Sequence, residues 1–140
     1  METPYKLKTV QVLLTSPDYD WERVGFWVSE RPAVIHHTAD YLTYSASETG
    51  AAYCMGMLAA DEDSDLLDPK SWTKERYPVL RTDESRGIYG PGHNSFTEDE
   101  EGNPIMVYHA RTEAEIEGNP AVQSKPSCHA DEIRWDEKQA

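Results

Sequence analysis

Hydrophobic and aromatic positions in this chain fall in short runs, and few segments show the spacing of an amphipathic helix. Short apolar runs bounded by turn-forming residues are typical of β-strands. The runs predict strands at 10–14, 33–35, 41–45, 53–60, 77–81, 94–97, 104–110 and 133–135. The pattern therefore predicts an all-β fold of the sandwich, barrel or propeller type.

Polar segments separate these runs and suggest how the strands connect. Residues 36–40 are polar and predict a hairpin, and the Glu101-Gly102-Asn103 turn predicts a second one. The glycines of 88–92 predict a tight turn, and 112–131 is expected to be irregular. The two units at 33–60 and 94–110 are candidates for successive propeller blades, although no sharp repeat is visible.

Composition narrows the classes of partner. The chain has 140 residues, a net charge of -13 and a sequence pI near 4.6. Binding to a nucleic-acid backbone or an anionic membrane surface requires clustered Lys and Arg, so neither partner is expected. The N-terminal residues lack the pattern of a signal peptide, and no apolar run approaches the ~20 residues of a membrane helix. The cellular compartment stays open.

The two cysteines do not predict a disulfide framework. Cys54 lies in an apolar run, where a buried small hydrophobic side chain is expected, and Cys128 lies far from it in sequence. The acidic stretch 61–65 begins like a calcium loop. It has Leu66 where such a loop needs glycine and Trp72 where it needs glutamate, so a solvated loop is favoured.

Glu30 is the candidate general acid. It stands before an apolar strand and beside Pro32, which fixes its own φ and lacks an N–H. A general acid must carry a proton at working pH, and burial beside aromatic groups favours this state. Phe26 and Trp27 are near enough in sequence to supply such burial. The alternative is a solvated glutamate before a strand.

His93 is the second candidate. It follows the glycine-rich segment 88–92 and precedes a predicted strand, so the chain could direct one imidazole at a ligand or ion. The alternative is a histidine that only hydrogen-bonds within the turn. The chain lacks a His-Glu-x-x-His zinc motif, a G-x-S-x-G nucleophile motif and a phosphate-binding glycine loop.

Several segments together resemble glycoside hydrolase family 43, in particular its exo-acting α-L-arabinofuranosidases. The matching segments are Tyr19-Asp20-Trp21-Glu22, Gly25-Phe26-Trp27-Val28, Glu30 with Pro32-Ala33-Val34-Ile35, Leu42-Thr43-Tyr44-Ser45-Ala46-Ser47, Tyr53-Cys54-Met55-Gly56, Asp65-Leu66-Leu67-Asp68-Pro69 with Ser71-Trp72-Thr73-Lys74, Tyr89-Gly90-Pro91-Gly92-His93-Asn94-Ser95-Phe96-Thr97, and Val107-Tyr108-His109-Ala110-Arg111. They run in order over most of the chain, so the match is more specific than any single motif.

The resemblance implies a partial five-bladed β-propeller, with about the last two to three blades in residues 1–118. Residues 119–140 would form a divergent segment that closes or trails the propeller. It also implies an inverting α-L-arabinofuranosidase that acts on arabinose-containing polysaccharide or oligosaccharide. No organic cofactor is implied.

The resemblance also assigns residues. Glu30 takes the general-acid position, Trp27, Tyr44 and Tyr89 are expected to bind substrate, and His93 is expected to hold calcium or another ion at the propeller axis.

Two departures from the family pattern matter. No segment resembles those that carry the family's aspartate base and second aspartate, so a chain with the missing blades is an expected partner. The family's Asn-Glu-Gly-Pro is replaced by Ser29-Glu30-Arg31-Pro32. The alternative function is a non-catalytic carbohydrate-binding or interaction fragment, in which Trp27, Tyr44, Tyr89 or Tyr108 would stack on sugar rings.

Overall fold

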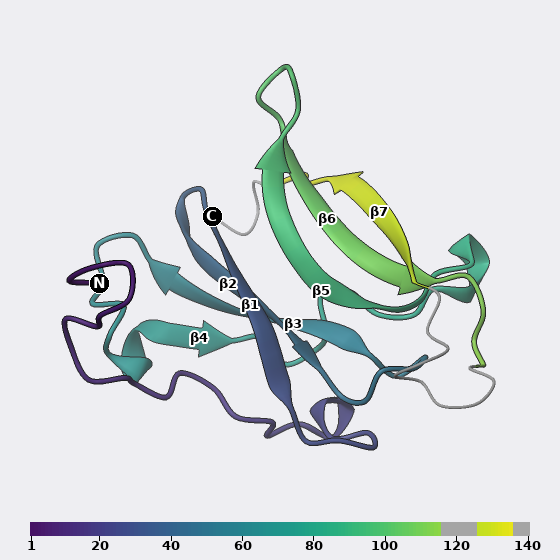
Figure 1. Ribbon diagram of the computed structural model, residues 1–140, viewed down its shortest axis with the longest axis horizontal. Coiled ribbons are helices and arrows are strands. Elements are labelled where there is room, and N and C mark those ends of the chain that lie inside the picture. The colour runs from purple at the N-terminus through teal and green to yellow at the C-terminus, as the bar shows by residue number, and fades with distance from the viewer. Residues whose placement is uncertain (116–125, 136–140) are drawn as a thin grey trace.

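The structure is a computed structural model that describes residues 1–115 and 126–135, and these form two antiparallel β-sheets (Figure 1). The first sheet has the order β1 (Ser29–His36), β2 (Ala39–Ala46), β3 (Cys54–Asp61) and β4 (Trp72–Lys74). The second has the order β5 (Tyr89–Glu98), β6 (Pro104–Arg111) and β7 (Ser127–Glu132). Short 3-10 helices lie in the connections: η1 (Asp20–Glu22), η2 (Pro69–Ser71) and η3 (Glu84–Arg86). The all-β prediction is confirmed.

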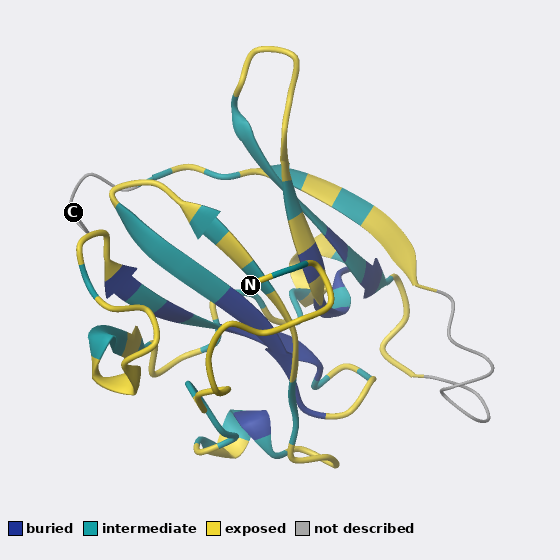
Figure 2. Ribbon diagram, turned by 60° about the vertical axis from the view of Figure 1, so that its left-hand side comes forward, coloured by how far each residue is buried: buried dark blue, intermediate teal, exposed yellow. Residues whose placement is uncertain are grey.

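Each sheet is a meander in which strands adjacent in sequence pair with one another. β5 lies against β1, β2 and β3, so the second sheet meets the first along this strand (Figure 1). Figure 2 shows the buried residues concentrated in the strands, with the loops and the N-terminal segment largely exposed. The described residues include no helix with the length and apolar character that crossing a bilayer requires.

β2 is buried on both faces, and its sequence explains how. Successive side chains on a strand point to opposite sides. Tyr44 and Ala46 join a hydrophobic cluster with residues from β3, and Leu14 and Trp21 of the N-terminal segment pack against this cluster. Thr43 and Ser45 are buried polar residues with hydrogen-bond partners outside β2, described below. The strand therefore links an apolar core to a polar face.

Glu22 anchors the connection that leads into β1. Its carboxylate is fully buried and accepts hydrogen bonds from Tyr44 Oη at 2.7 Å and from the backbone N–H groups of Asp18 and Tyr19 at 2.8 Å. Lys74 Nζ lies 2.8 Å from Oε1. Burial alone would raise the pKa of Glu22, but these hydrogen bonds and the charge of Lys74 outweigh it and hold the pKa below its usual value.

Several predicted elements differ from the observed ones. Residues 10–14 and 133–135 form no strand, and 77–81 contributes only an isolated bridge between Leu80 and Met55. The predicted turn at 88–92 is the start of β5. β7 begins within the stretch 112–131 that was expected to be irregular and ends one residue beyond it.

Short polar edge strands such as β7 are held by backbone pairing, which leaves no hydrophobic pattern to recognise. The predicted boundary between residues 118 and 119 lies outside the described residues.

Candidate active site

Glu30 lies at the start of β1, opposite Ser45 of β2. The pairing of β1 with β2 is irregular between Glu30 and Ala33. Within this irregularity Arg31 has a φ of 55°, a left-handed conformation that residues other than glycine rarely adopt. Pro32 follows it and fixes the next φ. A bulge redirects the side chains beside it, so this local backbone sets the direction of Glu30.

Tyr53 holds the carboxylate of Glu30. Its hydroxyl donates a hydrogen bond of 2.9 Å to Glu30 Oε1, and the tyrosine is 2% exposed. Burial raises the pKa of Tyr53 to about 12, together with the hydrogen bond to Glu30 and its negative charge. The phenol therefore keeps its proton near neutral pH. Glu30 itself is exposed, and the expected cover by Phe26 and Trp27 is wrong, because they are 64% and 68% exposed.

Two histidines of the second sheet extend this group of side chains. The rings of His109 and Tyr53 are stacked, with centroids 5.9 Å apart and 6° between the planes. His93 meets His109 edge-on at a centroid distance of 5.4 Å. Burial lowers the pKa of His109, and the charges of His93 and Arg111 lower it further. His109 is therefore neutral at neutral pH.

The backbone of β5 is irregular where it approaches β2. Its register with β6 shifts on both sides of Gly92, and His93 has a φ of 49°. The His93 N–H donates to Ser45 Oγ at 2.8 Å, and Thr43 Oγ1 donates to Asn94 Oδ1 at 3.0 Å. Two alternate residues of β2 thus fix the part of β5 that carries His93.

Gly92 permits the close approach of β5 to Tyr53. A Cβ at this residue would lie 2.8 Å from Tyr53 Cδ1 and 2.9 Å from Ser45 Oγ. Both distances are too short for van der Waals contact. A side chain at residue 92 would therefore displace the tyrosine that binds Glu30.

The structure shows no set of calcium ligands around His93 in the part of the chain that it describes. Calcium takes six to eight oxygen ligands, whereas the neighbour of His93 is the imidazole of His109. Among the described residues, no group of three or more His, Cys, Asp or Glu side chains could hold a metal ion. The ion at His93 stays a prediction, and no chemical step below uses it.

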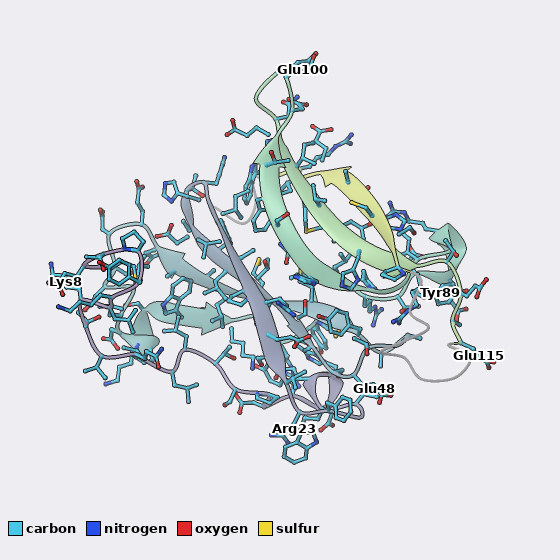
Figure 3. All side chains as sticks on the ribbon, viewed as in Figure 1. Lys8, Arg23, Glu48, Tyr89, Glu100 and Glu115 are labelled. Atoms are coloured by element: carbon cyan, nitrogen blue, oxygen red, sulfur yellow. The ribbon has the colours of Figure 1, made fainter. Side chains whose placement is uncertain are left out.

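The aromatic residues expected to bind sugar lie in different environments. Trp27 is exposed, and the guanidinium of Arg23 lies 4.6 Å from its ring centroid. Tyr89 is half-buried at the start of β5. Figure 3 shows Tyr89 beside the second sheet and Arg23, the partner of Trp27, at the lower end of the first sheet. Both aromatics keep an accessible part, so both stay proposed substrate contacts.

Tyr44 and Tyr108 offer no ring face to a ligand, which corrects the expectation for both. Each is 2% exposed. Tyr44 donates to Glu22, and Tyr108 donates to Asp131 Oδ2 at 2.7 Å and stacks on His129. Their hydroxyl groups form hydrogen bonds inside the fold. Their rings belong to two separate hydrophobic clusters of buried residues.

Sequence analysis did not assign a role to Tyr53, His109 or Ser45. Tyr53 stands just before β3 and reaches Glu30 across 23 residues of sequence, while His109 comes from the second sheet. No local motif joins them. Their shared feature is that each lies in a segment that carries the family resemblance.

Comparison with a family model matches residues 1–139 to Glycosyl hydrolases family 43. A curated extracellular exo-alpha-(1->5)-L-arabinofuranosidase of Streptomyces avermitilis is 44% identical over 137 residues, 96% of this chain and 28% of that protein. Alpha-L-arabinofuranosidase 43 of Humicola insolens is 38% identical over the same share of both chains. The chain thus spans little more than a quarter of these relatives.

Solved structures give the same relationship. An alpha-L-arabinofuranosidase from Lactobacillus brevis is 45% identical and superposes with a TM-score of 0.94 over 99% of this chain and 43% of that one. A thermostable family-43 glycoside hydrolase is 30% identical, with a TM-score of 0.74 over 94% of this chain and 41% of that one. The two sheets therefore have the arrangement found in part of these larger folds.

Proposed function

Because this chain belongs to glycosyl hydrolases family 43, whose fold is a five-bladed β-propeller, we propose that it contributes the general acid of an α-L-arabinofuranosidase. The substrate would be an arabinose-containing polysaccharide or oligosaccharide. The observation that carries this proposal is the bond from Tyr53 to Glu30 at the bulged start of β1. It ties a carboxylate on the accessible surface to a rigid, buried partner.

The two carboxylate oxygens of Glu30 have different roles in this proposal. Oε1 of Glu30 accepts from Tyr53, so Oε2 is the oxygen left to carry a proton. In the proposed step Oε2 gives that proton to the glycosidic oxygen as the bond to the arabinofuranosyl carbon breaks. Glu30 is then an anion, which the Tyr53 hydroxyl stabilises by the same hydrogen bond.

Inversion requires a second carboxylate. A base must activate water on the opposite side of the sugar, typically ~6.5–9.5 Å from the acid. No segment of this sequence resembles those that carry the family's base and second aspartate. We propose that both come from residues outside these 140, in the same polypeptide or in a partner chain that carries the other blades.

The alternative function is carbohydrate binding without catalysis. The exposed ring of Trp27 favours it, because aromatic faces on a surface stack on sugars. The guanidinium of Arg23 lies over this ring, 4.6 Å from its centroid.

Incubation of the chain with arabino-oligosaccharides, followed by measurement of free arabinose and of bound ligand, separates the two functions. Release of arabinose that Glu30→Gln abolishes supports the hydrolase. Binding without release even after addition of a chain with the other blades, weakened by Trp27→Ala and unchanged in Glu30→Gln, supports the alternative. Release that occurs only after addition of a chain with the other blades supports a split enzyme.

A further inference from the structure

We propose that Arg31 makes the site beside Glu30 selective for glycans that carry a carboxylate, by pairing its guanidinium with a uronic-acid group of the substrate. This inference rests on the proposed function, since it concerns which arabinose-containing glycan the site accepts. It is carried by the backbone at Arg31, by the exposure of its side chain and by the charges around Glu30.

The backbone of Arg31 is strained, because its conformation costs free energy for any residue other than glycine. Its φ of 55° lies in the region that glycine occupies without cost, yet the residue there is arginine. The conformation accompanies the register shift of β1 between Glu30 and Ala33, and it persists although Pro32 disfavours it, because a residue before proline prefers extended backbone with a negative φ. Strain of this kind clusters at functional sites, where the side chain serves a purpose that a glycine could not.

The guanidinium of Arg31 is available to a ligand. The residue is exposed, and among the described residues no carboxylate forms an ion pair with it. Two other arginines have partners: Arg23 lies over Trp27, and Arg86 pairs with Asp131. Arg31 thus places an unpaired cation next to the proposed acid.

The charges around Glu30 differ from those of the whole chain. The net charge of the chain is -13, but Arg31 stands directly next to this carboxylate in the sequence. The positive charge of Arg31 acts on the hydroxyl of Tyr53, and His93 and Arg111 act on His109. An anionic ligand that the rest of the surface repels is therefore attracted here.

A planar guanidinium matches a carboxylate through two parallel hydrogen bonds. A uronic-acid residue near the arabinofuranosyl group would present such a carboxylate while Glu30 faces the glycosidic oxygen. Neutral glycans would bind without this contact.

The test is a titration of the 140-residue chain with two arabinoxylo-oligosaccharides of equal length, with and without a glucuronic-acid branch. Arg31→Gln removes the charge, Arg31→Lys keeps it, and Arg81→Gln is a control at another exposed arginine. We expect the acidic ligand to bind about fivefold tighter, in line with the upper range for exposed ion pairs. We expect Arg31→Gln and high salt to abolish this preference, and Arg31→Lys to keep part of it.

Equal affinity for both ligands, unchanged in Arg31→Gln, would overturn the role of Arg31 and leave the proposed function intact. Failure to bind either ligand, also after addition of a chain with the other blades, would contradict both proposals. Circular dichroism of each variant ensures that a lost preference does not reflect a lost fold.

Discussion

The hydroxyl of Tyr53 and the carboxylate of Glu30 are joined by a hydrogen bond of 2.9 Å between a buried side chain and an exposed one. The buried partner is itself fixed by the stacked ring of His109 from the second sheet. The direction of the proposed acid is therefore set by both sheets, although Glu30 belongs to the first.

Tyr53→Phe should impair the reaction more than binding. The substitution keeps the ring and removes one hydrogen bond to a charged group, a contribution of about 1.5–3 kcal/mol. We expect kcat to fall at least about tenfold with little change in KM, because the bond acts on the acid rather than on substrate binding. Steady-state kinetics measure this split. A rise in KM with constant kcat would place Tyr53 in substrate binding instead.

Gly92→Ala should destabilise the fold and disturb the same hydrogen bond. The added Cβ would press on Tyr53 and Ser45, and overpacking of this kind costs about 1–3 kcal/mol. Urea denaturation followed by circular dichroism measures the loss. Gly50→Ala is the matched control, because a Cβ there meets nothing within 4 Å. Equal stability of the two variants would contradict the close approach of β5 to Tyr53.

Lys74→Met should cost about 3–5 kcal/mol, since it leaves the buried carboxylate of Glu22 without its cation. Chemical denaturation near pH 7 measures this loss. A change below about 1 kcal/mol would contradict the tight burial of Glu22.

The same carboxylate predicts how stability depends on pH. The pKa of Glu22 is held below its ordinary value of 4.5 in the folded chain. Its contribution is complete above that value and is lost as the pH falls through the lower folded pKa. Thermal melting between pH 7 and pH 2 should show this loss in the parent chain and a smaller one in Glu22→Gln. An equal slope in both would contradict the prediction.

At residue 31 we expect a glycine variant to be more stable than an alanine variant, which is the reverse of the usual order. Glycine is ordinarily less stable than alanine by about 0.5–1 kcal/mol, but at a positive φ the Cβ costs roughly 1–2 kcal/mol. Arg31→Gly should therefore be more stable than Arg31→Ala, while the same pair at Arg81 keeps the usual order. Melting temperatures of the four variants provide the comparison. The usual order at both residues would contradict the left-handed backbone at Arg31.

The two main hairpins were predictable because their strands are apolar and their turns polar. β1 with β2 and β5 with β6 were both found in this way, with boundaries that differ by a few residues. β4 and β7 were missed because they are short and largely polar. Residues 10–14 have strand-forming side chains but no partner strand, so they stay outside the sheets.

The candidate site was partly predictable. Glu30 and His93 were selected from local sequence and family resemblance. The different hydrogen-bond partners of Tyr44 and Tyr53 could not be predicted, because both are aromatic residues in apolar segments. Tyr44 faces the core with Glu22, and Tyr53 reaches Glu30, a difference that depends on which side of the first sheet β5 covers.

The most direct test of the central claim is hydrolysis of two aryl α-L-arabinofuranosides, one with a good leaving group and one with a poor one, by the 140-residue chain mixed with a chain that carries the other blades. Glu30→Gln is compared with Glu101→Gln, an exposed glutamate in the β5–β6 turn. General-acid catalysis contributes about 10²–10⁴-fold and is needed most by a poor leaving group. If Glu30 is the general acid, its loss abolishes turnover of the poor substrate and largely spares the good one, while Glu101→Gln matches the parent chain. Equal turnover of the poor substrate by Glu30→Gln and the parent, or no turnover of either substrate by the parent chain in the presence of the other blades, would contradict the account.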